Sequence, residues 1–363
     1  MRRIFKRMTA LAALTALVLC AGCGASDPAP AAAEARTGER ETLGLLMARE
    51  DPFLTELKEQ IQAEAAARGY DVRAYNAGND PEAQLRQVHQ ALADGVETLL
   101  VNLAEGEDAE KIAGIVGDAG VVLINRAPET AILNDRMVFV GMDEAGAGAL
   151  QGRALADYFW ETDHGTDLRY LLFQGVPDQE NTDARSAGAL QSLLDDGFFP
   201  VAAADYQVCG FDRQRAADAM TDLLAQGVTY DCVICGNDEM AIGVIGALKA
   251  AGRDPGAVPI VSVDHTEAGA NALEAGELYM TVDQNAGLQA KAAVAAAVNL
   301  DQGRPFDSGL ADLLGETYTD PDQPYTQPGA GGAGRGGGPG KMGERGGGGR
   351  GAGRGGCLWG GGW

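Results

Sequence analysis

Histidine and aromatic residues are scarce in this chain of 363 residues, which has 3 histidines and 6% aromatic residues. His89 falls within a helical pattern and His164 within an acidic turn, so neither lies near a candidate nucleophile. His265 follows Asp264, where a structural or capping role is the simpler interpretation. No glycine-rich phosphate loop or G-x-S-x-G motif stands in the right sequence context. The sequence therefore predicts that the protein is not an enzyme.

Positive charge is also in the minority. The chain has 28 Lys and Arg residues against 52 Asp and Glu residues, which gives a formal net charge of −24 at pH 7. Nucleic acids and anionic lipids both attract basic protein surfaces. The charge balance therefore argues against either as a partner and leaves a small neutral ligand open.

The cysteines are too few and too scattered to form a disulfide framework or a metal site. Two lie near the start of the chain and one near its end, which leaves Cys209, Cys232 and Cys235 for a folded core. Cys232 and Cys235 have CxxC spacing, but they lie inside an apolar strand pattern and no second ligand pair exists. We expect buried thiols and no bound metal.

The first 40 residues are typical of an export signal followed by a tether. Basic residues precede an apolar run from Met8 to Leu19, which is too short to span a bilayer as a stable helix. The following segment, Leu19-Cys20-Ala21-Gly22-Cys23, resembles a bacterial lipobox, in which Cys23 would be acylated. We therefore expect a signal peptide at 1–22 and a lipid-anchored linker at 23–40, with the protein outside the cytoplasm on a bacterial membrane. An ordinary cleaved signal peptide is the alternative.

From residue 42 onward, short apolar runs alternate with helical patterns such as Leu54, Leu57, Ile61 and Ala65. The almost continuous apolar character of the runs is typical of strands buried on both faces of a parallel sheet. The ten runs are Thr42–Ala48, Val72–Ala77, Thr98–Leu103, Val121–Asn125, Met137–Met142, Tyr170–Gly175, Ala203–Val208, Cys232–Asn237, Ile260–Asp264 and Tyr279–Gln284.

Alternating strands and helices predict a doubly wound α/β fold. Ten strands are too many for one compact sheet of this type, so we expect two doubly wound parallel-sheet lobes joined by a hinge. The crossover is expected at Met142–Asp143 and the return at Gln284–Gly287. The N-terminal lobe would then comprise 41–142 with 286–315, and the C-terminal lobe 143–285.

Polar residues close several of the apolar runs, where ligands bind in doubly wound sheets. They are Asp51, Asn125, Asn237 with Asp238, Asp264 and Gln284. Helix capping explains any one of them without a ligand, and capping is the expected role of Asp238.

Several segments of the chain together resemble the periplasmic sugar-binding proteins, specifically their galactose/glucose-binding and ribose-binding branches. The resemblance runs from about Leu43 to Leu314. The segments are Asp51-Pro52-Phe53-Leu54, Ile124-Asn125-Arg126, Pro177–Arg185, Gly210-Phe211-Asp212-Arg213, Gly236–Gly243, Val263-Asp264 and Thr281–Gln284. The resemblance implies a type I periplasmic binding protein, which holds a monosaccharide between its lobes and delivers it to the permease of an ABC importer.

The resemblance also implies which residues would hold the sugar. Phe53 and Phe211 would supply two aromatic faces for the apolar C–H surfaces of the ring. Side chains that form paired hydrogen bonds with hydroxyls would surround its edge. These are Asp51, Asn125, Arg185, Asn237, Asp264 and Gln284, with Gln179 and Asn181 where the galactose branch has a histidine and an aspartate.

The expected site mixes features of both branches. Phe211 and Gln284 match the ribose branch, whereas Asp51 and Asn125 match the galactose branch. We expect a galactose-like or glucose-like monosaccharide, with ribose, another pentose or inositol as alternatives. The calcium loop of the galactose branch is reduced to 161–167, so we expect no calcium and no cofactor.

Two other roles share this fold. A repressor of the lac family would need an N-terminal helix-turn-helix and a basic surface, and the chain begins instead with an export signal. A role as a ligand-sensing accessory of a membrane receptor remains an alternative to a role as a transport component. Whether the protein is a transport component or a receptor accessory, we expect it to be a monomer.

After Gln327 the composition changes to glycine with arginine, so we expect a disordered tail at 328–363. Our preferred explanation is a frameshift, because the family normally continues with another strand and crossing segment that we expect to be missing after Tyr325. A nucleic-acid-binding tail is the weaker interpretation, since an exported chain meets little nucleic acid.

Overall fold

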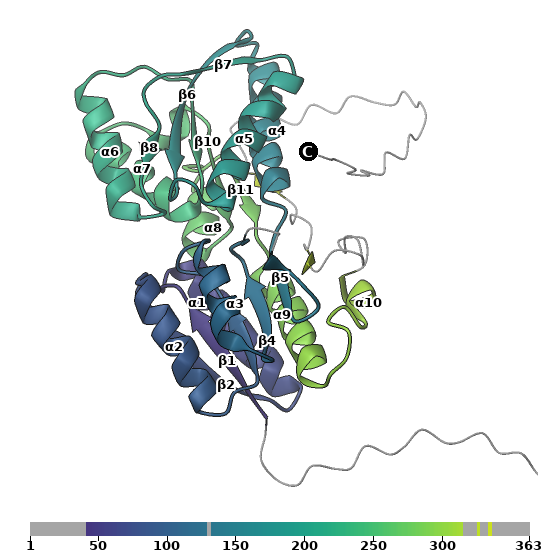
Figure 1. Cartoon of the computed structure of the whole chain (residues 1–363). Helices are drawn as coiled ribbons and strands as arrows, with labels where there is room; N and C mark the ends of the chain where they lie inside the picture. Colours follow the sequence, from purple (N-terminus) through teal and green to yellow (C-terminus); the bar gives the residue numbers. More distant parts are fainter. Residues whose placement is uncertain (1–40, 129–131, 315–324, 327–332, 336–363) are drawn as a thin grey trace, which may run out of the picture. The chain divides into compact units, whose positions relative to one another are not determined.

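The computed structural model describes residues 41–128, 132–314, 325–326 and 333–335. The predicted signal peptide, Cys23 and the linker lie outside the described residues. In the described part of the chain, no helix combines the length and the apolar character needed to cross a membrane. The structure consists of two α/β lobes, each a sheet with helices on both faces (Figure 1). This confirms the predicted fold class.

The N-terminal lobe contains a parallel sheet with the strand order β12-β5-β4-β3-β1-β2. Its strands are β1 (Thr42–Met47), β2 (Asp71–Asn76), β3 (Thr98–Val101), β4 (Gly120–Ile124), β5 (Met137–Val140) and β12 (Tyr325–Thr326). Its helices are α1 (Pro52–Ala67), α2 (Pro81–Ala93), α3 (Asp108–Val116), α9 (Ala286–Asp301) and α10 (Leu310–Leu314). Strands β3, β4 and β5 are buried along their whole length, as expected for a sheet covered on both faces.

The C-terminal lobe contains a second sheet with the order β13-β11-β10-β9-β6-β7, and β8 also pairs with β6. Its strands are β6 (Asp167–Gln174), β7 (Phe199–Ala202), β8 (Gln207–Val208), β9 (Cys232–Cys235), β10 (Ile260–Asp264), β11 (Met280–Asp283) and β13 (Ala333–Arg335). Its helices are α4 (Glu144–Thr162), α5 (Glu180–Asp195), α6 (Arg213–Ala225), α7 (Asp238–Ala250) and α8 (Glu267–Glu274), with a 3-10 turn at Pro255–Ala257. Cys209, Cys232 and Cys235 are free and buried in this lobe, as predicted.

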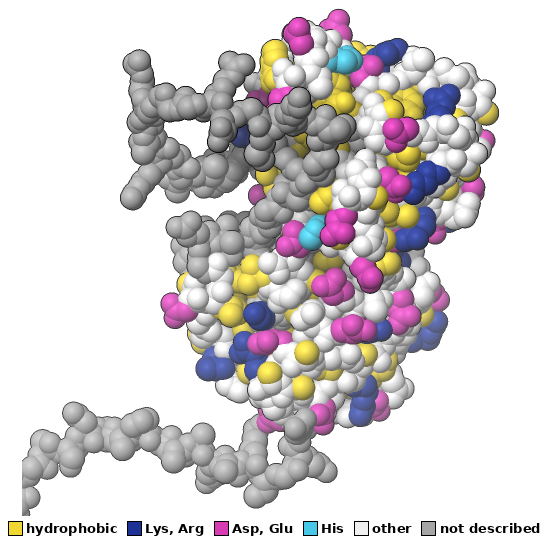
Figure 2. Space-filling view, turned by 180° about the vertical axis from the view of Figure 1, so that it is seen from behind, with side chains coloured by type: hydrophobic (Ala, Val, Ile, Leu, Met, Phe, Trp, Pro, Cys, Tyr) yellow, Lys and Arg dark blue, Asp and Glu magenta, His cyan; other side chains and the backbone are white. Residues whose placement is uncertain are grey.

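Each sheet separates two apolar layers. In the N-terminal lobe, one face packs against α1 and the alanine-rich α9, and the other packs against α2 and α3. In the C-terminal lobe, α4 and α5 cover one face while α6 and α7 cover the other. Acidic and basic side chains are interspersed on the face shown in Figure 2.

One predicted strand is wrong. Only the last two residues of the run Ala203–Val208 form a strand, β8, and the sheet edge is made by β7 instead. Strand β7 leaves Phe199 60% exposed and Val201 59% exposed. Strand β7 contains Pro200, and proline within a sheet is confined to edge strands and bulges, so the sequence of β7 does not predict a buried strand.

The last two strands extend both sheets. Strand β12 pairs in parallel with β5, and β13 pairs antiparallel with β11. The sequence predicts no further strand after Tyr325, but β13 lies within the segment predicted to be a disordered tail. The rest of that segment lies outside the described residues.

Helices α4 and α5 approach each other through glycine. A Cβ atom on Gly148 would collide with the carbonyl oxygen of Arg185, and one on Gly152 would collide with that of Ala189. On α5, a Cβ on Gly188 would meet the carbonyl oxygen of Ala145. This close contact fixes the position of α5, which carries two predicted ligand-binding residues, Asn181 and Arg185.

Candidate functional site

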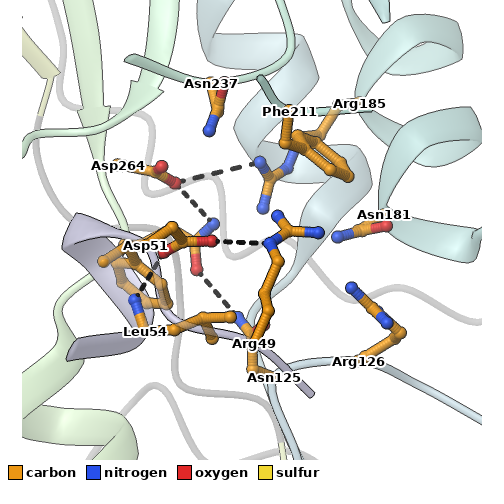
Figure 3. A pocket seen from close by; sticks show the side chains of 12 residues that line it. Arg49, Asp51, Leu54, Asn125, Arg126, Asn181, Arg185, Phe211, Asn237 and Asp264 are labelled. Atoms are coloured by element: carbon orange, nitrogen blue, oxygen red, sulfur yellow. Dashed lines mark hydrogen bonds and ion pairs between the residues drawn. The ribbon is translucent and has the colours of Figure 1, made fainter. Parts of the chain in front are cut away.

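A pocket lies where residues from both lobes meet (Figure 3). Most of its lining comes from residues that follow the carboxyl ends of strands, which is the expected position of a ligand in this type of sheet. It is lined by Arg49, Asp51, Phe53, Leu54, Asn125, Arg126, Asn181, Arg185, Phe211, Asn237, Asp264 and Gln284. Of the ten residues predicted to hold the sugar, only Gln179 is missing from this lining.

Asp51 begins helix α1 and faces the pocket at the same time. Its Oδ1 accepts a hydrogen bond from the backbone N–H of Leu54 at 2.8 Å, which caps the helix. Its Oδ2 accepts from Nε of Arg49 at 3.1 Å. The capping interpretation and the pocket prediction therefore both describe the same carboxylate.

An amide relay connects the two lobes beneath the pocket. Nδ2 of Asn125 donates to Oε1 of Gln284 at 3.2 Å, and Nε2 of Gln284 donates to Oδ1 of Asp264 at 2.9 Å. Behind Asn125, Nδ2 of Asn102 donates to Oδ1 of Asn125 at 3.4 Å. Nε2 of Gln289 bonds the backbone oxygen of Gln284 at 2.8 Å. The orientation of these amides is therefore set by one another before any ligand binds.

Arg185 is a deeply buried cation of the pocket, with 3% of its surface exposed. Its Nε donates to Oε2 of Glu144 at 2.5 Å, and Nη1 donates to the backbone oxygen of Gly236 at 2.7 Å. Nη1 also lies 3.9 Å from Oδ1 of Asp264. Burial acts against the charged form, but Glu144, Asp264 and Glu180 together outweigh it and raise the pKa of Arg185. Arg185 is therefore a fixed, permanently charged donor.

For the acidic partners of Arg185, burial outweighs the effect of the arginine charge and disfavours the charged form. Burial raises the pKa of Glu144, and it raises that of Asp264 well above its ordinary value, although Arg185 opposes both changes. Asp264 also has a backbone φ of 122°, in a region that residues with a Cβ rarely adopt. Asn125 and Phe211 also have positive φ angles, of 63° each.

Arg126 is a buried residue of the pocket lining and has no carboxylate partner among the described residues. Its Nη1 donates to the backbone oxygens of Leu103 and Ala104, the latter at 2.6 Å. Burial, together with the charge of Arg49, lowers the pKa of Arg126 to about 10. The buried Nε of Arg126 has no hydrogen-bond acceptor among the described residues.

Helix α7 is capped by Asn237 and not by Asp238, which was predicted to be the cap. Oδ1 of Asn237 accepts from the backbone N–H of Met240 at 3.1 Å, so Asn237 is the cap of α7. Asp238 is fully buried and bonds the hydroxyls of Ser262, Thr281 and Thr266, and also the backbone N–H of Thr266. The prediction that Asp238 caps the helix is therefore wrong, because it instead ties α7 to β10 and β11.

Helix α5 brings unpaired polar atoms to the site. The side chain of Asn181 is 7% exposed, and its Oδ1 has no protein partner in the described structure. Gln179 stands at the N-cap of α5 and makes no side-chain capping bond. Its Oε1 is buried without a partner, but the residue does not line the pocket.

The aromatic side chains face the pocket from opposite lobes. Phe53 belongs to α1 and is 6% exposed, and Phe211 precedes α6 and is 7% exposed. The guanidinium carbon of Arg49 lies 5.5 Å from the centre of the Phe211 ring. The sequence does not indicate Arg49 as a pocket residue, because the contact joins residues 162 positions apart.

The described residues contain no group of three or more His, Cys, Asp or Glu side chains that could hold a metal ion. Near the short turn at 161–167, Asp231 bonds the side chain of Arg169, with Nη2 of Arg169 3.0 Å from Oδ1. The absence of calcium stays a prediction.

Comparison with known proteins gives the chain a family. A model described as a periplasmic binding protein domain matches residues 45–305. A Rhizobium meliloti protein described as rhizopine-binding is 31% identical over 272 residues, which cover 74% of this chain and 86% of the relative. The ribose import binding protein of Haemophilus influenzae is 28% identical over 306 residues and covers 84% and 97%.

A solved structure resembles the chain as well. It is an ABC transporter solute binding protein from Bacillus halodurans with bound myo-inositol, 27% identical, with a TM-score of 0.66 and coverage of 74% of this chain and 92% of that one. These relatives are binding proteins rather than enzymes, as the sequence analysis expected. The match over most of its length shows that the chain belongs to the periplasmic binding protein family.

Proposed function

We propose that this protein is the solute-binding component of an ABC importer and captures a small, neutral, cyclic polyol such as a pentose or inositol. The observation that carries the proposal is the pocket itself. Two phenylalanines face it from opposite lobes, and its remaining lining is dominated by carboxylate, amide and guanidinium groups. Such groups match hydroxyls, which both donate and accept hydrogen bonds.

The charges of the site support a neutral ligand. Two of its arginines are already paired with carboxylates, Arg49 with Asp51 and Arg185 with the buried Glu144. A ligand with a net charge would leave one of these groups uncompensated in a desolvated site, which is costly. An uncharged polyol adds hydrogen bonds without disturbing these pairs.

The named relatives support a polyol but no particular sugar. Proteins described as binding ribose, xylitol and galactose are 28%, 28% and 26% identical to the chain. The expected galactose-like or glucose-like ligand is therefore not favoured over ribose, another pentose or inositol.

We also propose that Cys23 carries a lipid anchor and that the protein works as a monomer without a cofactor. The lipobox-like segment before Cys23 supports the anchor. The Cys23→Ser variant should move the protein from the membrane fraction to the soluble extracytoplasmic fraction and abolish labelling by a radioactive fatty acid. Unchanged labelling would reject the anchor.

Thermal-shift measurements with myo-inositol, D-ribose, xylitol and D-galactose test the ligand class. A ligand at 100 times its dissociation constant stabilises the folded state by about 2.7 kcal/mol. The Asp264→Asn variant should lose most of the shift, while Asp205→Asn, which changes an exposed aspartate, should keep it. A shift with an amino acid or a nucleoside and none with any neutral polyol would reject the proposal.

A further inference from the structure

Arg49 occupies a position that two neighbouring groups determine. It lies between β1 and α1, in the segment that leads to the N-cap of α1. Its Nε donates to Oδ2 of Asp51, and its guanidinium lies over the ring of Phe211 from the other lobe (Figure 3). The side chain is 20% exposed. A carboxylate at one edge and an aromatic ring against its face therefore hold this guanidinium in place.

This position changes what Phe211 can offer a ligand. The far end of the Phe211 ring packs against Gly175, where an added Cβ would collide with it. Arg49 lies against the ring as well. A sugar ring and a guanidinium group cannot share the same aromatic face. Arg49 therefore takes one face of Phe211 away from a ligand, which leaves Phe53 as the phenylalanine whose stacking surface Arg49 does not occupy.

The donors of Arg49 are only partly used. Within the described residues, its guanidinium meets one protein acceptor, Oδ2 of Asp51, through Nε. The two Nη groups are thus left to the pocket that Arg49 lines. A guanidinium fork matches two neighbouring oxygen atoms, because its donors lie parallel in one plane.

We propose, resting on the proposed function, that Arg49 is a specificity-determining residue that forms one wall of the pocket and grips two adjacent hydroxyls of the ligand through its Nη groups. The wall makes the site select compact polyols with a free vicinal pair of hydroxyls. The aromatic sandwich expected from sequence is replaced by one aromatic face and one guanidinium plane.

Isothermal titration of the wild type, Arg49→Met and Arg49→Lys tests the proposal. The probes are D-ribose with 2-deoxy-D-ribose, and myo-inositol with its monodeoxy derivatives. Losing charge-assisted hydrogen bonds should weaken binding of the parent polyol by Arg49→Met about 10- to 100-fold. Arg49→Lys should recover little of this loss, because an ammonium group lacks the fork.

The deoxy probes separate direct contact from indirect effects. In the wild type, at least one deoxy derivative should bind about 10-fold more weakly than its parent polyol. In Arg49→Met, the same derivative and its parent should bind equally. A residue that only supports the fold would leave the difference between parent and derivative unchanged.

Arg86→Met is the matched control. Arg86 lies 3.6 Å from Asp80, which caps α2 as Asp51 caps α1, but it is 68% exposed and outside the pocket. This variant should bind as the wild type does. If Arg49→Met keeps the wild-type dissociation constants within about twofold, or if Arg49→Lys restores them, the role of Arg49 is refuted while the proposed function stands. If the wild type binds none of the probes, both fail together.

Discussion

The buried pair of Glu144 and Arg185 allows a strong test of how the site is held together. Glu144 is 2% exposed and Arg185 is 3% exposed, and Nε and Oε2 are 2.5 Å apart. Glu144 belongs to the first turn of α4, whereas Arg185 belongs to α5. The pair thus joins the two closely packed helices directly behind the pocket.

Removing one partner leaves the other charge buried and uncompensated. Such a change costs about 3–5 kcal/mol in the free energy of unfolding, a large part of the 5–15 kcal/mol that folded proteins have. We expect this loss for Glu144→Ala and a similar loss for Arg185→Met. The double variant has no isolated charge, so it should cost less than the sum of the single variants by about 2 kcal/mol or more.

Urea unfolding at pH 7, followed by circular dichroism, measures all three free energies. Arg213 and Glu239 form the control cycle, since Nη2 and Oε1 are also 2.5 Å apart but the Arg213 side chain is 47% exposed. The coupling of this exposed pair should be about 0–1 kcal/mol. Losses at Glu144 and Arg185 that add to within about 0.5 kcal/mol would refute the reasoning, because distant, independent sites behave in that way.

Three further predictions concern the packing and titration of the lobes. Gly148→Ala should destabilise the protein by about 1–3 kcal/mol in urea unfolding, because the new methyl group collides with α5, whereas Gly114→Ala in the open middle of α3 should not destabilise it. Asp238→Ala should cost about 3 kcal/mol or more in the same assay, because its buried donors lose their acceptor, and a loss below 1 kcal/mol would contradict this. Burial raises the pKa of Asp301 to about 6, above its unfolded value of about 3.9, so its contribution to stability is present below pH 4 and is lost as the pH rises through 6. Asp301→Asn should therefore flatten the fall in unfolding free energy between pH 4 and pH 6, and an unchanged slope would show that this carboxyl does not cause the fall.

The predictable part of the fold depends on local patterns. Buried strands such as β3 and β4 appear in the sequence as continuous apolar runs, and the polar residues after them mark the pocket edge. Asp51 could be found in two ways, as an N-cap and as a strand-end residue. Strand β7 was missed although its residues are apolar, because Pro200 in its middle argues against a strand away from a sheet edge.

The parts of the site that could not be predicted depend on long-range contacts. The position of Arg49 over Phe211 and the pair of Glu144 with Arg185 join residues from separate elements. Nothing in the neighbouring sequence of Arg49 or Glu144 indicates these partners. Arg126 lies in a segment that carries the family resemblance, so it was the missed residue closest to being identified.

The positive φ angles of Asn125, Phe211 and Asp264 have a consequence for how this protein can change. Each such backbone conformation costs about 1–3 kcal/mol for a residue with a side chain, and glycine adopts positive φ far more readily. Glycine at these positions would relieve the strain and also delete the group that faces the pocket. A variant of this protein that becomes more stable through glycine at Asn125 or Asp264 should therefore be one that no longer holds a ligand.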